Sequence, residues 1–247
     1  MICRRRTHQL LSMASEPPLH KGAALKHRIK DRFWVKLLKW HLYKRYRKPA
    51  GWHTTFAFER LVRSLKPGDV VLDCGANVGV LTNTLAATGA TVHAFEPDPY
   101  SFEKLTSNTH KYPNVHLYNA AIGVDKKPVK LFRSPDFTTD PEKHSISSSV
   151  FEDKKNVTEE NFVDVNQIDF IEFINTLAAP VKLTKMDIEG AEVPILEEII
   201  RRNITEKFGV MFVETHESRI PSLAERTTRI RQLVQERHAD RVFLDWE

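Results

Sequence analysis

The chain has 247 residues and a formal net charge of +5, with 41% hydrophobic and 28% charged residues, as in an ordinary globular protein. That length suits one domain, or one domain with an appendage. Its two cysteines, Cys3 and Cys74, exclude a disulfide framework and a cysteine-rich zinc site, and no run of ~20 apolar residues predicts a membrane span, so we expect a cytoplasmic protein.

The positive charge is concentrated at the N-terminus. Residues 1–48 hold 14 lysines and arginines but only two acids, whereas the rest of the chain is mildly acidic. We interpret residues 1–21 as a disordered basic arm and residues 22–50 as a basic amphipathic helix with interleaved Trp and Tyr. Such a helix either packs on the following domain or lies on an anionic membrane at residues 22–48. We expect no nucleic-acid partner, because nucleic-acid enzymes usually spread positive charge around the site.

Residues 51–247 alternate between strand and helix patterns, which predicts a Rossmann-like, doubly wound, mostly parallel α/β sheet. The polar segment 134–160 is expected to be a long loop, and residues 162–177 a short strand followed by a helix. The other strands are expected at 69–74, 91–96, 115–120, 129–133, 181–187, 210–215 and 241–244, and the other helices at 56–64, 80–87, 100–112, 191–202 and 222–238.

The first strand and helix of this body are joined by the turn "DCGANVG", which starts at Asp73. Gly75 permits a tight turn, and Gly79 lets the helix start lie close to the strand and to a ligand. Glu96 ends the second strand 23 positions after Asp73. An acid at that place can accept hydrogen bonds from both hydroxyls of a ribose.

These features favour a cationic nucleoside over a dinucleotide. A pyrophosphate needs a GxGxxG turn, whereas the glycines here are four positions apart and Asp73 would place a negative charge near a phosphate. S-adenosyl-L-methionine keeps the ribose and carries a sulfonium and an ammonium instead, so a carboxylate favours its binding. Adenine contacts often follow the third strand. The residues expected to bind the cofactor are Asp73, Gly75, Asn77, Gly79, Glu96, Asn119 and Ala120.

The ordered stretches "VVLDCGANVG", "VHAFEPDPYSFEKLTSN", "NAAIG", "SISSSV", "VNQIDFIEFI" and "KMDIEGAE" resemble the FkbM-type methyltransferases, which are class I S-adenosylmethionine-dependent enzymes. They lie between about Val70 and Thr215. The resemblance implies O-methylation of a hydroxyl on a sugar, glycolipid or polyketide, and rhizobial enzymes that methylate the fucose of nodulation signals are one such group. The sequence departs from the class at its end, where only "DRVFLDWE" stands in place of two antiparallel strands.

The catalytic residues are expected in and after "KMDIEGAE", which brings Lys185, Asp187 and Glu189 to the carboxyl edge of the sheet. Alternation places Lys185 and Asp187 on one face of the strand. We predict that Asp187 acts on the acceptor as base or orienter, that Lys185 pairs with it or holds the acceptor, and that Glu189 hydrogen-bonds the sugar. His216, after the fifth strand, is the alternative base. We interpret Glu192 as a carboxylate that stabilises the start of a helix.

A metal ion is not expected. Asp187, Glu189 and Glu214 could gather a divalent cation, but neither their spacing nor the resemblance requires one. The loop around "HSISSSV" (144–150) is long enough to close over a substrate.

The sequence therefore predicts an O-methyltransferase acting on a sugar, glycolipid or polyketide hydroxyl, cytoplasmic or peripheral to the inner face of the membrane. Two alternatives stay open. One is a membrane-docked binding protein on a catalytically silent methyltransferase fold, and the other is a nucleic-acid methyltransferase, which the absence of an Asn/Asp-Pro-Pro-Tyr/Phe motif disfavours.

Overall fold

The computed structural model describes residues 51–145 and 148–246. The chain divides into two units, Met1–Pro49 and Ala50–Glu247. Because the first unit lies outside the described residues, the predicted disordered arm and basic helix lie outside them too. No helix among the described residues has the length and apolar character that crossing a membrane requires.

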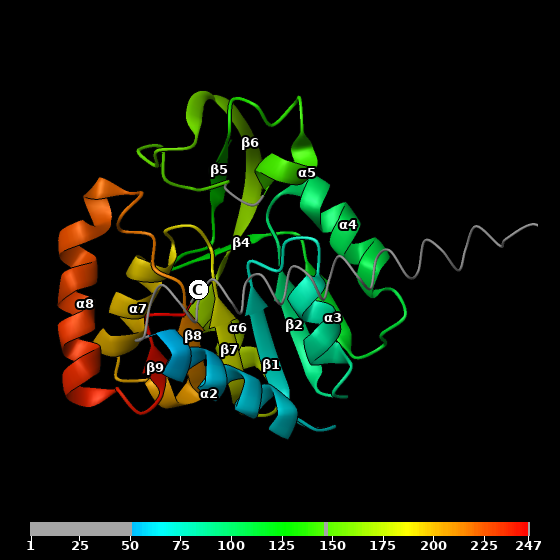
Figure 1. Ribbon diagram of the computed structural model, residues 1–247, viewed down its shortest axis with the longest axis vertical. Coiled ribbons are helices and arrows are strands. Elements are labelled where there is room, and N and C mark those ends of the chain that lie inside the picture. Colours follow the sequence, from blue (N-terminus) through cyan, green and yellow to red (C-terminus); the bar gives the residue numbers. More distant parts are fainter. Residues whose placement is uncertain (1–50, 146–147, 247) are drawn as a thin grey trace, which may run out of the picture. The chain divides into compact units, whose positions relative to one another are not determined.

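The second unit is built on a six-stranded sheet in which every neighbouring pair of strands is parallel (Figure 1). The predicted Rossmann-like fold is therefore confirmed. At the edge, the two-residue β9 (Val242–Phe243) pairs in parallel with β8 (Val210–Val213), and one antiparallel bridge joins Glu214 to Asp245. The strand order is β3 (Val115–Tyr118), β2 (Thr91–Phe95), β1 (Val70–Cys74), β7 (Val181–Met186), β8 (Val210–Val213) and β9 (Val242–Phe243).

Helices cover both faces of this sheet, because the strands are apolar on both sides. The helices are α2 (Gly51–Ser64), α3 (Val80–Ala86), α4 (Pro99–Thr109), α6 (Phe170–Thr176), α7 (Glu192–Arg201) and α8 (Ala224–Arg237), with the 3-10 helices η2 (Thr205–Phe208) and η3 (Pro221–Leu223). In β1, Val71 packs in a cluster with residues of α2, α3 and α4, whereas Leu72 packs in the opposite cluster with residues of α6, α7 and α8.

Side-chain caps fix where two of these helices begin. Asp98 precedes α4 and accepts a hydrogen bond from the Tyr100 amide, with Pro99 at the first helical position. Asp169 precedes α6 in the same way. The start of α4 is held further by Arg133, whose Nε lies 2.8 Å from Asp98 Oδ2. This ion pair ties the helix to the second sheet, described next.

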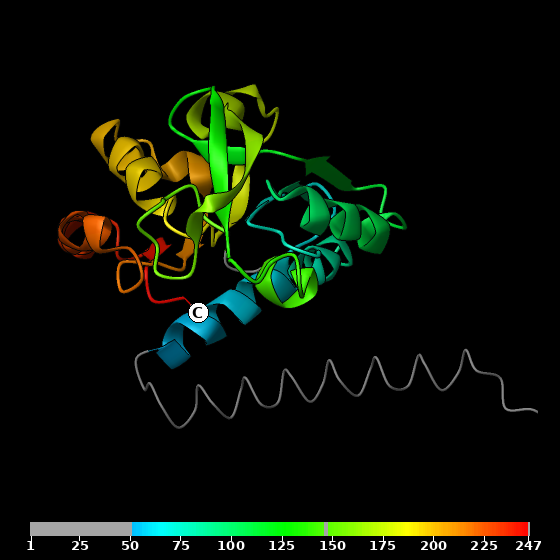
Figure 2. The same cartoon turned by 90° about the horizontal axis from the view of Figure 1, so that it is seen from above.

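A second, three-stranded sheet lies beyond the carboxyl ends of β1 and β2 (Figures 1 and 2). Two expectations were wrong here. The third strand was expected to run to Ala120, but it ends at Tyr118, and Asn119 turns the chain into a separate strand. Residues 134–160 were expected to be loop, but they contain a short helix and the start of a strand. This sheet has the order β4 (Ala121–Gly123), β6 (Thr158–Asp169) and β5 (Pro128–Arg133), and the short helix is α5 (Pro141–His144).

Candidate active site

The turn after β1 is pressed against the end of β7. Gly75 has a φ of +78°, and a Cβ atom built there would collide with the carbonyl oxygen of Asp187. The amide of Gly75 donates to Phe95 O at 3.0 Å, and the amide of Asp187 donates to Cys74 O at 3.1 Å. Glycine is therefore required at this position both for its backbone angle and for the close approach of the two strand ends.

Glu96, at the end of β2, reaches back to this turn. Its Oε2 accepts from the Asn77 amide at 2.8 Å, and its Oε1 accepts from the Asp98 amide at 2.9 Å. Burial raises the pKa of Glu96 to about 7, although these two backbone hydrogen bonds favour the ionised form. The carboxylate is held in one orientation and lies at a cavity wall.

That cavity has a volume of about 180 Å³ and lies at the carboxyl edge of the sheet, where ligands bind in folds of this kind. Four of the residues expected to bind the cofactor line it: Gly75, Asn77, Glu96 and Ala120. So do Asp187 and Glu189. Its apolar walls were not predicted from the sequence. They come from both sheets and the strand ends: Phe95, Pro97, Ile122, Leu131, Val150 and Ile188.

The other three expected cofactor residues do not line the cavity. Asp73 is fully buried and accepts a hydrogen bond from Thr82 Oγ1 at 2.6 Å. Gly79 allows α3 to approach α4, since a Cβ there would lie 2.7 Å from Leu105 Cδ1. Asn119 donates to Glu96 O at 2.9 Å. These three residues contact the elements around the cavity but do not line it. That they contact the cofactor directly stays a prediction.

Lys185 is buried beneath the glycine turn. Its Nζ donates to Gly75 O at 2.6 Å and to Cys74 O at 3.1 Å, and lies 3.7 Å from Asp187 Oδ2, so the predicted pairing with Asp187 is present. Burial lowers the pKa of this ammonium, but Asp187 and Asp73 outweigh that effect and leave it raised. Lys185 is therefore a charged ammonium that fixes the glycine turn through two hydrogen bonds to its carbonyl oxygens.

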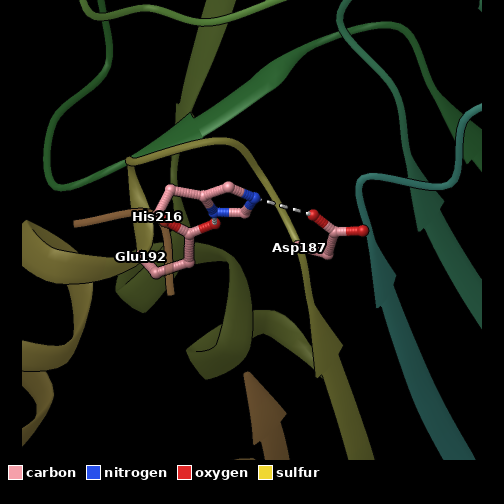
Figure 3. A group of neighbouring side chains, drawn as sticks. All are labelled: Asp187, Glu192 and His216. Carbon is pink, nitrogen blue, oxygen red and sulfur yellow. Dashed lines mark hydrogen bonds and ion pairs between the residues drawn. The ribbon is translucent and has the colours of Figure 1, made fainter. Parts of the chain in front are cut away.

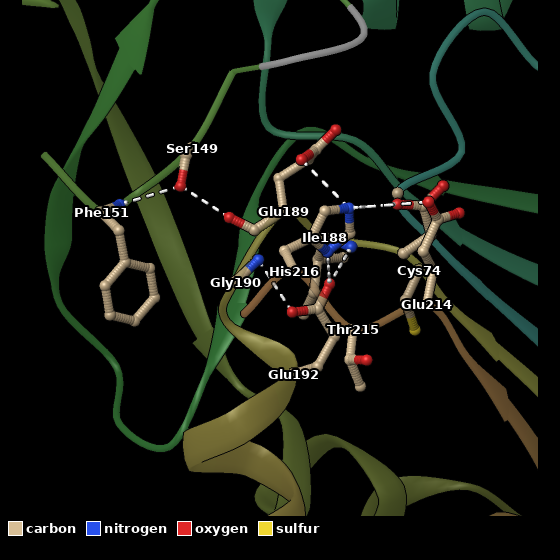
Figure 4. Close-up of polar contacts among 12 residues, drawn as sticks. Cys74, Ser149, Phe151, Ile188, Glu189, Gly190, Glu192, Glu214, Thr215 and His216 are labelled. Carbon is tan, nitrogen blue, oxygen red and sulfur yellow. Dashed lines mark hydrogen bonds and ion pairs between the residues drawn. The ribbon is translucent and has the colours of Figure 1, made fainter. Parts of the chain in front are cut away.

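Asp187 and Glu189 follow β7 and differ in their surroundings. The Asp187 side chain is 31% exposed, whereas that of Glu189 is 13% exposed and lies 2.7 Å from Lys154 Nζ. Ser149 Oγ donates to Glu189 O at 2.6 Å, so the segment after β5 is fastened to this corner (Figure 4). Asp187 is thus the predicted catalytic residue most open to an acceptor.

His216 lies behind them and does not line the cavity. Its ring is 3% exposed, with Nδ1 3.1 Å from Glu192 Oε1 and Nε2 directed toward Asp187 (Figure 3). Burial lowers the pKa of the imidazole, but Glu192, Glu189 and Asp187 outweigh that effect and raise it to about 9. Because it is shielded from the cavity, His216 is poorly placed to take a proton from an acceptor.

Glu192 stabilises the turn before α7, as the sequence suggested. Its Oε1 accepts from the Ile188 amide and its Oε2 from the Gly190 amide, both at 2.8 Å. One ligand atom each from Asp187, Glu192 and His216 lie within 4.8 Å of one another, so this group could hold a metal ion.

The sequence matches the methyltransferase FkbM domain over residues 73–242. The chain belongs to this family. The FkbM domain thus contains the whole glycine turn, the cavity and the residues after β7 and β8, and it confirms the resemblance found in the sequence. The family is one of methyltransferases, whose methyl donor is S-adenosyl-L-methionine.

Curated relatives of this FkbM domain include methyltransferases for different acceptors. It is 50% identical to the 31-O-demethyl-FK506 methyltransferase FkbM of Streptomyces tacrolimicus over 50 residues, which are 19% of each chain. It is 23% identical to the hexuronic acid methyltransferase AglP of Haloferax volcanii over 63% of this chain and 59% of AglP. A ribosomal RNA small subunit methyltransferase A of Thermotoga neapolitana is 48% identical over 24% of each chain. The chain therefore spans less than two thirds of the length of each of these relatives.

Two solved structures also resemble the FkbM domain. P. horikoshii TYW2 in complex with MeSAdo is 33% identical over 25% of each chain, with a TM-score of 0.24. A TehB-like SAM-dependent methyltransferase from Corynebacterium glutamicum is 13% identical over 69% of this chain and 70% of its own, with a TM-score of 0.33.

Proposed function

We propose that the protein transfers the methyl group of S-adenosylmethionine to a hydroxyl of a sugar, glycolipid or related glycan. The observation that carries this proposal is the placement of Asp187, a partly exposed carboxylate, on the wall of the same cavity as Glu96. The hexuronic acid specificity in the name of AglP, the longest match among the three relatives described, supports a sugar acceptor.

In this proposal the nucleoside occupies the Glu96 end of the cavity. The ribose hydroxyls donate to the Glu96 carboxylate, and the apolar side chains of Pro97, Leu131 and Ile188 enclose the base. The sulfonium then lies between the Gly75 turn and Asp187, where negative charge favours it.

Methyl transfer is an in-line displacement. A lone pair of the acceptor oxygen attacks the methyl carbon, the new C–O bond forms as the C–S bond breaks, and the electron pair of that bond returns to sulfur to give neutral S-adenosylhomocysteine. The hydroxyl proton passes to Asp187. Much of the rate comes from alignment of oxygen, carbon and sulfur, and the base adds to it because a sugar hydroxyl is a poor nucleophile at neutral pH.

The test is transfer of labelled methyl from S-adenosylmethionine into a panel of free hexuronic acids, glycans, lipid-linked sugars, polyketide alcohols and RNA. We expect label in a sugar-containing fraction, as a methyl ether that resists mild alkali, and none with Glu96→Ala. Label in RNA alone would instead support the nucleic-acid alternative. Cofactor binding without transfer to any acceptor would support the catalytically silent one.

A further inference from the structure

Two serines on the wall of the cavity have unused hydroxyl groups. Ser145 and Ser148 both line the cavity, and the Oγ atom of each is buried. Neither Oγ atom has a hydrogen-bond partner among the described residues. A buried polar group without a partner is uncommon in folded proteins and lowers their stability. The fold alone therefore does not explain these two hydroxyls.

Ser148 is held close to the acids that follow β7. The next residue, Ser149, pairs with Phe132 of β5 through two backbone hydrogen bonds of 2.7 and 2.9 Å. Ser149 Oγ donates to Glu189 O at 2.6 Å (Figure 4). Side chains alternate along an extended segment, so Ser148 and Val150 share the opposite face, and both line the cavity. Ser148 is therefore fixed near Glu189 on the cavity side.

Ser145 follows α5, which is fastened to the end of β5. Nδ1 of His144 lies 3.3 Å from Ser134 Oγ, and Ser134 O accepts from Asn161 Nδ2 of β6 at 2.8 Å. Ser145 itself is 6% exposed. Both serines thus belong to segments that the second sheet holds in place. Rotation about one side-chain bond is enough to turn a serine hydroxyl toward a ligand in the cavity.

The charge of the cavity wall disfavours an anionic acceptor. Among the described residues that form it, none is Lys, Arg or His, and the charged ones are acids: Glu96, Asp187 and Glu189. The cations that contact two of these acids do not line the cavity: Lys154, Lys185 and His216. A carboxylate or phosphate beside Asp187 would meet like charge without a cation in contact, which is unfavourable. An uncharged acceptor avoids this cost.

The serines are available for the acceptor because the cofactor has other partners in the proposed function. Glu96 accepts from the ribose hydroxyls, apolar side chains enclose the base, and the sulfonium lies beside Asp187. A serine hydroxyl both donates and accepts a hydrogen bond, which matches the hydroxyl groups of a sugar ring.

We propose that Ser145 and Ser148 bind ring hydroxyls of the acceptor, and that the sugar ring to be methylated is uncharged. This assignment rests on the proposed function and narrows it, because hexuronates and sugar phosphates are then poor acceptors. In this respect the protein differs from AglP, whose name specifies a hexuronic acid.

The first measurement is thermal unfolding of the full chain. Ser145→Ala and Ser148→Ala remove hydroxyls that stabilise nothing in the fold, so their Tm should equal or exceed that of the wild type. Ser149→Ala is the matched comparison, because the Ser149 hydroxyl donates to Glu189 O and accepts from the Phe151 amide at 3.0 Å. Its Tm should fall. An equal fall for the other two variants would show that their hydroxyls serve the fold and would overturn the assignment.

The second measurement is calorimetric titration of the protein saturated with S-adenosylhomocysteine. The probes are the methyl glycosides of glucose, galactose and mannose, each paired with its uronate. We expect at least one neutral glycoside to bind, and to bind about three- to tenfold more weakly to Ser148→Ala and to Ser145→Ala. Its uronate should bind at least about tenfold more weakly to the wild type. Ser64→Ala, at an exposed position that ends α2, is the control and should stay within about twofold of the wild type.

The assignment fails if no neutral glycoside binds, if a uronate binds as tightly as its neutral partner, or if the two serine variants bind glycosides like the wild type. Weaker binding of S-adenosylhomocysteine to Ser148→Ala would place the hydroxyl at the cofactor and would equally overturn it. These readouts need no turnover. Methyl label in a uronate would therefore sustain the proposed function and refute the serine subsite, whereas glycoside binding without transfer to any acceptor would refute only the proposed function.

Discussion

Nζ of Lys154 lies 2.7 Å from Oε2 of Glu189, and the lysine side chain has no exposed surface. The two residues are 35 positions apart in the sequence, one in the segment between β5 and β6 and the other in the turn after β7. Burial lowers the pKa of Lys154, and Glu189 partly restores it. The pair therefore fastens the segment around Ser149 to the corner of the active site.

Lys154→Ala should destabilise the protein strongly, because it removes the fully buried cation that lies 2.7 Å from Glu189 Oε2. We expect the free energy of unfolding to fall by about 3–5 kcal/mol in a denaturant titration. Lys155→Ala is the control, since its side chain is exposed and donates to a backbone carbonyl, Ser218 O. Its cost should stay below about 1 kcal/mol. Equal effects of the two substitutions would contradict a structural role for the buried pair.

The sequence revealed the strands that position the cofactor site, because each is a compact apolar run followed by a distinctive turn. Val70–Cys74 ends at the glycine turn, and Glu96 directly follows the buried β2. Both features are local. Gly75, Asn77 and Glu96 belong to these turns and were predicted to bind the cofactor. In the structure all three line the cavity.

The rest of the fold and of the site could not be predicted, because it depends on contacts between residues that are far apart in the sequence. A lysine in a polar stretch is ordinarily exposed, so nothing near Lys154 predicts its burial against Glu189. β6 begins with "TEEN", which has no apolar alternation, and its partner β5 supplies the reason for its extended form. The surroundings of Asp73 are also invisible in the sequence: Thr82 Oγ1 donates to its Oδ2, and Nζ of Lys185 lies 3.6 Å from its Oδ1.

Cofactor affinity should depend on pH through Glu96. The pKa of Glu96 is about 7, and the ionised form is the better acceptor for two ribose hydroxyls. The ionised fraction rises about tenfold between pH 6 and pH 8, so the Kd for S-adenosylhomocysteine should fall about tenfold over that range. Glu96→Gln should bind more weakly and lose this dependence. A wild-type affinity that is flat with pH would argue against Glu96 as the ribose ligand.

The Glu96 carboxyl group should affect the stability of the protein with the opposite pH trend. Its pKa of about 7 in the folded state exceeds the ordinary glutamate value of 4.5, so the folded state retains the proton to a higher pH than the unfolded state. The contribution of Glu96 to the free energy of unfolding is therefore largest below pH 4.5 and declines as the pH rises to about 7. Comparing wild type with Glu96→Gln in denaturant at pH 5 and pH 7.5 isolates this contribution. A difference between them that does not change with pH would contradict it.

Gly75→Ala should abolish cofactor binding. Its Cβ would collide with the Asp187 carbonyl, and its φ of +78° is unfavourable for alanine. Gly68→Ala is a matched control, because φ is +95° there but no atom lies within 4 Å of the added Cβ. We expect the control to cost about 1–2 kcal/mol of stability and to bind S-adenosylhomocysteine normally. Normal binding by Gly75→Ala would show that the two strand ends separate easily.

Asp187→Asn should separate catalysis from binding. Loss of a base that acts only in the transition state is expected to lower kcat about 10²–10⁴-fold. The Kd for S-adenosylhomocysteine should change little, since Glu96 and the Gly75 turn are left in place. Single-turnover kinetics with saturating cofactor measures the effect. An unchanged kcat would remove Asp187 from the mechanism.

The most direct test of the account is a crystal structure of the protein with S-adenosylhomocysteine. We expect both ribose hydroxyls within hydrogen-bond distance of the Glu96 carboxylate and the sulfur between Gly75 and Asp187. A nucleoside bound elsewhere, with Glu96 still engaged only by the Asn77 and Asp98 amides, would contradict it.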